Sequence, residues 1–179
     1  YNRSVIYGVA TDDSHEYSEW GTGRTNPGRG WIMVRSPFLT PNEITKSIKS
    51  GDFYSSTGVE FSKLELGTDL IEVAVKEKPG VEYRIEFIGT KRDADFSYKM
   101  KRQRHAHRGN ENHHHIEQRF YSESLGRILA SSDGPHASYT PEGDELYVRV
   151  RVTSTRTHPN PYADGDYEMA WSQPVVIGK

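Results

Sequence analysis

Two aspartates and a histidine stand close together near the start of the chain, in the stretch ATDDSH. Asp13 and His15 are two residues apart, and they follow an apolar run, residues 5–10, with the composition of a short buried strand. Side chains at positions i and i+2 of a strand point the same way, so this spacing aims a carboxylate and an imidazole together. Both groups are common ligands of divalent metals, and the end of a strand holds them rigidly. The pattern indicates a metal site, with an acidic turn after a strand as the alternative.

A glycine-rich loop, residues 16–30, separates this stretch from a second predicted strand over residues 31–35. Because the loop leads into a strand, it lacks the helix N-terminus that lets glycine-rich loops bind phosphate. Arg24 and Arg29 are close enough in sequence to reach an anionic substrate beside the aspartates, and solvated loop arginines are the alternative.

The helix signals of the chain are concentrated between residues 40 and 51. Thr40 predicts an N-cap, proline follows at the first helical position, and Gly51 ends the predicted helix over residues 41–50. Its buried stripe is expected to contain two isoleucines four residues apart, Ile44 and Ile48.

From about residue 59 onward the apolar residues recur with period two. The runs DLIEVAVKE, EYRIEFIG and ELYVRVRVTST each alternate apolar and polar side chains. Such strands have one buried face, which is typical of antiparallel sheets, and several in about 120 residues predict a β-sandwich. The apolar phase changes near Lys63, where we expect a bulge or an edge.

A basic, histidine-rich segment near residues 92–115 interrupts this pattern, and we expect it to be a long exposed loop. Its histidines have no spacing that fixes a set of metal ligands, so metal binding here is an alternative to plain solvation. The basic run could contact phosphates or RNA, but the chain carries 23 basic and 25 acidic residues, a net charge of −2. Nucleic acid is therefore not an expected partner.

Composition excludes several other classes. The chain contains no cysteine, which excludes disulfides, thiolate metal sites and cysteine nucleophiles. No apolar run approaches the roughly 18 residues of a membrane span, so no membrane partner is expected. The sequence opens inside a strand-like segment, as a chain that begins in the middle of a fold would.

The first 60 residues resemble the carboxyl-terminal end of the PHP (polymerase and histidinol phosphatase) metallohydrolase domain. The resemblance rests on GVATDDSHEY and on NPGRGWIMVRSPFLTPNEITKSIKSGDFYSSTGVEF, which agree in order and spacing over about 50 residues. The downstream stretches GDELYVRVRVTST and GDYEMAWSQPVVI are similar to the small β-sandwich that often follows this domain.

In that family a closing strand ends in a D-x-H motif that supplies the last metal ligands, which implies Asp13 and His15 as ligands here. Asp12 would then orient the histidine without binding the metal itself, and Arg29 would contact the substrate. The implied cofactor is Zn, Mn or Fe, and the implied substrate is a small-molecule ester or phosphoester. Bound metal would lower the pKa of a water molecule and produce hydroxide near neutral pH.

This sequence departs from the family at its beginning. The family's first ligands form an H-x-H motif before the D-x-H, whereas the only such motif here, at His105 and His107, comes after it. A barrel needs roughly 200 residues or more, and two ligands fall short of the three usual for catalytic zinc.

We therefore expect an α+β chain, with residues 1–58 as a partial PHP-type α/β barrel remnant and residues 59–179 as an antiparallel β-sandwich. Its function would be that of the carboxyl-terminal portion of a metal-dependent hydrolase, inactive alone because the other ligands lie outside the chain. The alternative is a non-catalytic β-sandwich module that binds carbohydrate or protein.

Overall fold

A computed structural model describes residues 5–105 and 114–178, without the side chains of residues 103–105 and 114–116. Antiparallel sheets dominate this part of the chain, and one helix, α1 (Pro41–Ser50), accompanies them. The fold is therefore sandwich-like, as the period-two pattern predicts.

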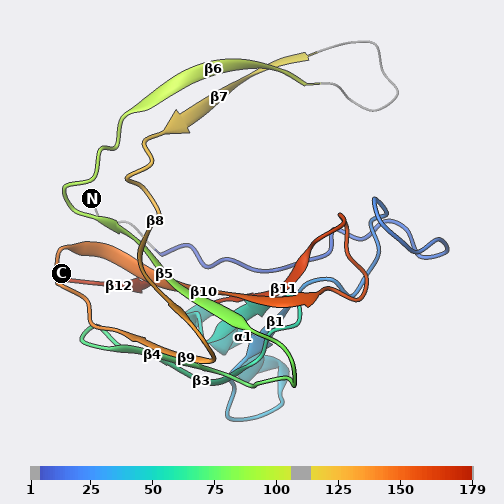
Figure 1. Ribbon diagram of the computed structural model, residues 1–179, viewed down its shortest axis with the longest axis horizontal. Coiled ribbons are helices and arrows are strands. Elements are labelled where there is room, and N and C mark those ends of the chain that lie inside the picture. Colours follow the sequence, from blue (N-terminus) through green and yellow to red (C-terminus); the bar gives the residue numbers. More distant parts are fainter. Residues whose placement is uncertain (1–4, 106–113, 179) are drawn as a thin grey trace.

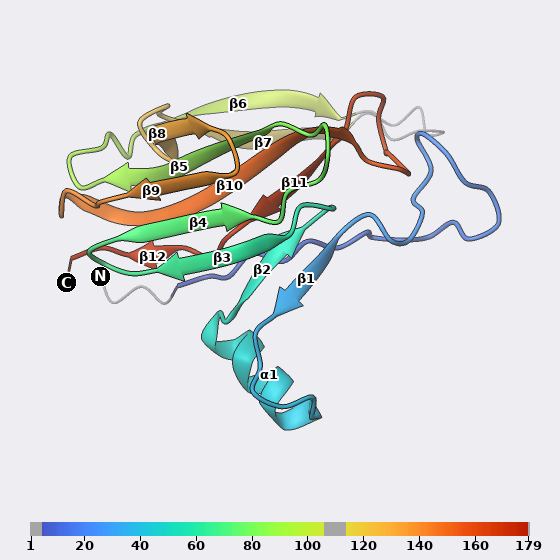
Figure 2. The ribbon, with the colours of Figure 1, turned by 60° about the horizontal axis from the view of Figure 1, so that its bottom comes forward.

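Two sheets form the body. The larger sheet has the order β1 (Trp31–Val34), β2 (Phe53–Ser56), β11 (Tyr167–Trp171), β10 (Glu145–Thr157), β5 (Tyr83–Lys91) and β8 (Arg127–Asp133), with β12 (Val175–Val176) also paired to β10. The smaller sheet has the order β3 (Phe61–Leu66), β4 (Ile71–Val75) and β9 (His136–Tyr139). Figure 2 shows the smaller sheet lying against β5 and β10 of the larger one.

The core lies between these sheets. The predicted alternation is confirmed on β4, β5 and β10, whose inward side chains are at most 5% exposed: Ile71, Val73, Val75, Tyr83, Ile85, Phe87, Val148, Val150 and Val152. Full burial of each such side chain contributes about 1.5–3 kcal/mol, so these alternating positions are the main stabilising contacts of the body. The bulge expected near Lys63 is present as a register shift between Phe61 and Lys63.

Helix α1 is confirmed with both of its ends. The Thr40 side chain accepts a hydrogen bond from the Glu43 backbone N–H, and Gly51 ends the helix in the left-handed conformation, at φ 81°. The expected buried stripe is only half-buried, because the helix contacts little besides β1 and projects from the rim of the body (Figure 2).

The prediction of a buried strand at residues 5–11 is wrong. This segment is extended but forms no strand, and Ile6 and Val9 are 88% and 56% exposed. Side chains hold it in place of a backbone ladder. Ser55 Oγ donates to Gly8 O and accepts from Ala10 N, at 3.0 Å each, and the Gln173 amide bonds both Gly8 N and Gly8 O.

The prediction of a long loop near residues 92–115 is also wrong. Strands β6 (Tyr98–His105) and β7 (His114–Tyr121) form a hairpin, which we call the β6–β7 arm. It pairs with neither body sheet, and Figure 1 shows it arching away from the body. Side-chain contacts between the two strands stabilise the hairpin. The Tyr98 and Tyr121 rings lie 5.6 Å apart, and Lys101 lies over the Phe120 ring at 4.6 Å. The histidines between residues 106 and 113 lie outside the described residues.

The amino-terminal region and the sandwich share one sheet. Strands β1 and β2 join β10 through β11, with Ser56 opposite Ala170 and Ser55 opposite Trp171. The segment at residues 5–12 is thereby held against the outer face of this sheet, the face away from the core, where Ser55 lies.

Candidate functional site

Asp13 and His15 lie on an exposed loop directly after the extended segment. Asp13 has a φ of 47° and is the only non-glycine with a positive φ in the described part of the chain. Aspartate tolerates the left-handed region better than most residues, but the conformation still costs about 1 kcal/mol. Such strain is concentrated at functional sites, so the loop with Asp13 and His15, which we call the corner, is a candidate functional site.

The backbone of Asp13 fixes the imidazole of His15. His15 Nδ1 lies 2.5 Å from the carbonyl oxygen of Asp13, and the His15 N–H donates to Thr25 O at 2.9 Å. Because a carbonyl can only accept, Nδ1 carries the proton of the neutral ring and Nε2 keeps its lone pair. Histidines that bind metals are commonly oriented by such a bond to the second nitrogen.

Asp12 holds the turn at residues 28–30. Its carboxylate accepts the backbone N–H groups of Gly28 and Arg29 at 2.7 Å and of Gly30 at 2.6 Å. Partial burial raises the pKa of Asp12, but these three donors and the charge of Arg29 together lower that pKa below its ordinary value of 3.8. No bond to His15 is found, so Asp12 supports the neighbouring loop and does not orient the imidazole directly.

Arg29 joins the glycine-rich loop to the loop around residue 160. Its guanidinium donates to the carbonyl oxygens of Asn160, at 2.7 Å, Gly21, at 3.1 Å, and Pro161, at 3.2 Å, and it also donates to Arg24 O. It therefore cross-links two loops and presents few donors to a substrate. Arg24 lies on the surface in ion pairs with Glu16 and Glu19.

The corner offers two possible metal ligands, and the residues that the structure describes bring no third one to it. In the described ranges, one group of three possible ligands occurs elsewhere, at Glu142, Asp144 and Glu145. Lys91 already binds two members of that group, with Nζ 2.5 Å from Glu142 and 3.0 Å from Asp144. Glu145 is fully buried and accepts the Tyr139 hydroxyl at 2.6 Å, so this group is a structural cluster.

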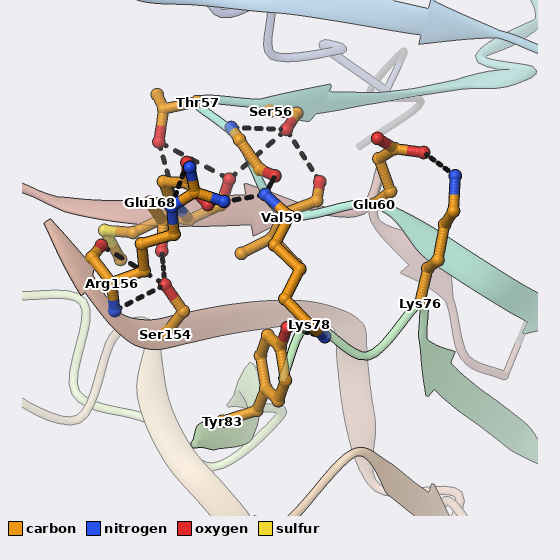
Figure 3. Close-up of polar contacts among 12 residues, drawn as sticks. Ser56, Thr57, Val59, Glu60, Lys76, Lys78, Tyr83, Ser154, Arg156 and Glu168 are labelled. Atoms are coloured by element: carbon orange, nitrogen blue, oxygen red, sulfur yellow. Dashed lines mark hydrogen bonds and ion pairs between the residues drawn. The ribbon is translucent and has the colours of Figure 1, made fainter. Parts of the chain in front are cut away.

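A charge cluster around a buried glutamate joins the rims of the two sheets (Figure 3). Glu168 of β11 is 4% exposed and binds Lys78 Nζ at 2.8 Å, and Arg156 lies 3.5 Å away. Gly58 makes room for it, because a Cβ there would lie 2.4 Å from Glu168 Cδ. This cluster is not among the sites predicted from the sequence. The available signal was the alternation of YEMAW, which places Glu168 on the same face as the buried Ala170.

A groove of about 1690 Å³ crosses the outer face of the larger sheet. The extended segment forms one wall with Val5 and Val9, and the base of the β6–β7 arm forms another with Phe96 and Tyr121. Its floor includes two half-buried aromatic residues of β10 and β11, Tyr147 and Trp171. Asp12 and Arg29 also line it, so the groove extends to the loop that carries Asp13 and His15.

No protein family, curated protein sequence or solved structure matches this chain. Within the described residues, no helix is both long and apolar enough to cross a membrane.

Proposed function

We propose that this chain is the carboxyl-terminal portion of a PHP-type metal-dependent hydrolase, in which Asp13 and His15 supply two ligands of the metal centre. The remaining ligands would come from outside the chain. The centre would use Zn, Mn or Fe to activate water against a small ester or phosphoester.

The observation that carries this proposal is the orientation of His15. Its Nδ1 is bonded to Asp13 O, so Nε2 is the coordinating atom, and both side chains are exposed on one short loop. A structural aspartate–histidine pair would be expected to use the carboxylate and both ring nitrogens in bonds to each other or to the body. Here the Asp13 carboxylate and His15 Nε2 make no such bond to the residues that the structure describes.

The exposure of apolar side chains in the first 39 residues gives independent support. Two of them, Ile6 and Leu39, are 88% and 94% exposed. The exposed large side chains in this region are Val5, Ile6, Val9, Tyr17, Trp20, Trp31, Met33, Phe38 and Leu39. Exposure of so many apolar side chains within one part of the sequence favours their cover by another layer of protein. The missing part of an α/β barrel would be such a layer.

The test uses the protein encoded by the complete reading frame that contains this chain. We expect it to bind stoichiometric divalent metal and to hydrolyse a chromogenic phosphoester. The double substitution Asp13→Asn/His15→Ala should remove both properties. The matched control is Asp69→Asn/His136→Ala, which changes an exposed aspartate and an exposed histidine elsewhere on the body. Metal content and activity that survive the first pair of substitutions would refute the proposal.

The β6–β7 arm favours a second candidate function, that of a protein-binding module. Tyr98, Met100 and Tyr121 on the arm are about half exposed, and Lys99 and Lys101 stand between them in sequence. A two-stranded hairpin is marginally stable alone, so a partner with an acidic surface would stabilise it. Retention of the chain on immobilised polyglutamate, lost when residues 98–121 are removed, would support this candidate. Equal retention of both forms would exclude it.

A further inference from the structure

Most of the polar side chains that line the groove are engaged in bonds within the chain. Asp12 is bound by backbone N–H groups, Arg29 donates to loop carbonyls, and Gln173 bonds the backbone of Gly8. Ser172 donates to Gln173 O and accepts from Val150 N, and Thr90 accepts from Gly126 N. These groups build the groove and are not available to a ligand.

Among the charged side chains that line the groove, Arg149 is the exception. It is a half-buried residue of β10 that lines the groove, and it has no hydrogen-bond or ion-pair partner among the residues that the structure describes. The residue opposite it on β5 is Ile88, whereas Arg151, two positions along, faces Glu86 and binds it at 2.7 Å. The sheet therefore compensates one outward arginine and leaves the next without an anion.

An uncompensated guanidinium beside apolar walls favours an anionic ligand. Arginine binds carboxylate, sulfonate and phosphate groups through two parallel N–H donors, and partial desolvation strengthens the contact. Tyr147 shares the outer face with Arg149, because the two residues are two apart on one strand. Trp171 pairs with Arg151 on the neighbouring strand and lines the same groove. Both rings offer surfaces on which a flat apolar group can stack.

We propose that this groove binds an organic anion with an aromatic or other flat apolar body, which places its charged group on Arg149 and its body against Tyr147 and Trp171. The site needs neither metal nor the ligands Asp13 and His15. It therefore stands or fails independently of the proposed hydrolase.

The test compares two probes with the same naphthalene body, naphthoate, whose polar group is an anion, and naphthylmethanol, whose polar group is uncharged. Calorimetry on the 179-residue chain should show naphthoate binding at one site and naphthylmethanol binding roughly tenfold or more weakly. Arg149→Gln should reduce the affinity for naphthoate to that of the neutral probe, and Trp171→Ala should weaken both probes. Asp13→Asn/His15→Ala should leave naphthoate binding unchanged.

The matched control is Arg127→Gln, which removes an exposed arginine of β8 that does not line the groove. It should bind both probes as the unaltered chain does, and circular dichroism of each variant confirms that the sheet is intact. The proposal is overturned if naphthoate does not bind, if both probes bind equally, or if the folded Arg149→Gln chain keeps the full affinity for naphthoate.

Discussion

Asp12 stabilises the turn at residues 28–30 only while its carboxyl group is ionised, because three N–H donors point at it. Its pKa is lowered in the folded chain, so the stabilisation is complete above the unfolded-state pKa and is lost as the pH falls through the folded-state pKa. We expect the free energy of unfolding to decrease below about pH 4. Asp12→Asn should cost about 1–3 kcal/mol near neutral pH and flatten this dependence.

Urea titrations between about pH 6 and pH 3 measure this effect. Asp164→Asn is a suitable control, because Asp164 is exposed and its one hydrogen bond, from Thr22 Oγ1, is long at 3.5 Å. An Asp12→Asn chain with the same acid sensitivity as the unaltered chain would contradict the assigned role.

Gly58 is required by the carboxylate that it faces. A methyl group at this position would lie 2.4 Å from Glu168 Cδ, and the φ of 141° is itself unfavourable for alanine. Gly21 has nearly the same φ, 144°, with nothing within 4 Å of a Cβ. We expect Gly58→Ala to destabilise the chain by about 2–4 kcal/mol more than Gly21→Ala, as measured by urea denaturation. Equal losses would mean that the backbone alone requires glycine.

The types of the residues indicate which positions could take part in chemistry. They do not indicate which neighbours form hydrogen bonds with each side chain. Asp13 and His15 were found from a carboxylate and an imidazole two positions apart, and the structure places them on one exposed loop. The roles of Asp12 and Arg29 depend on backbone groups that are distant in sequence, for example Arg29 with Asn160, 131 residues away. No local pattern encodes such contacts. The metal-ligand role of Asp13 and His15 remains a prediction.

Among the elements, the β6–β7 arm is the most independent part of the described structure. Its strands pair only with each other, and Ser122 N donates to Ser97 O at its base, at 3.3 Å. Replacing residues 98–121 with a short glycine–serine linker should therefore change the melting temperature by only a few degrees. Calorimetry of both chains measures this difference. Loss of the cooperative transition would show that the arm is part of the body.

An element whose ends are marked by residues within it could be predicted from the sequence. An element whose structure depends on distant parts of the chain could not. Thr40 and Gly51 mark both ends of α1 in the sequence, so the helix was predicted to the residue. The run at residues 5–10 has strand composition but receives side-chain bonds where a strand partner would lie, so it forms no ladder. The charged residues of the arm predict a loop, because they interrupt the alternation that would indicate strands and the pairing of Tyr98 with Tyr121.

At the scale of the whole molecule, the coordination number predicts that the 179-residue chain alone is inactive and binds metal weakly at Asp13 and His15. Zinc needs three or four protein ligands, and each missing one is replaced by water at a large loss of affinity. Residues 105–115 hold five of the eight histidines and should collect most of the metal without order.

Metal uptake and phosphoester hydrolysis of three chains measure this expectation. Asp13→Asn/His15→Ala should change uptake little, deletion of residues 105–115 should remove most of it, and none of the chains should hydrolyse the substrate. Stoichiometric metal held through Asp13 and His15, together with turnover, would contradict it. A dependence of that turnover on protein concentration would then identify a second copy of the chain as the source of the missing ligands.

The pairing of β2 with β11 also determines when the chain can fold during synthesis. The Met169 N–H donates to Thr57 Oγ1, its partner 112 residues earlier in the chain. As the ribosome releases the chain from the amino terminus, β1 and β2 emerge before β11 and can pair with each other, but the other edge of β2 has no partner until β11 appears. Contacts of such long sequence separation form slowly, because loop closure must precede them. The amino-terminal unit should therefore complete its folding only after β11 has left the ribosome, with the edge of β2 exposed to chaperones or to other nascent chains until then.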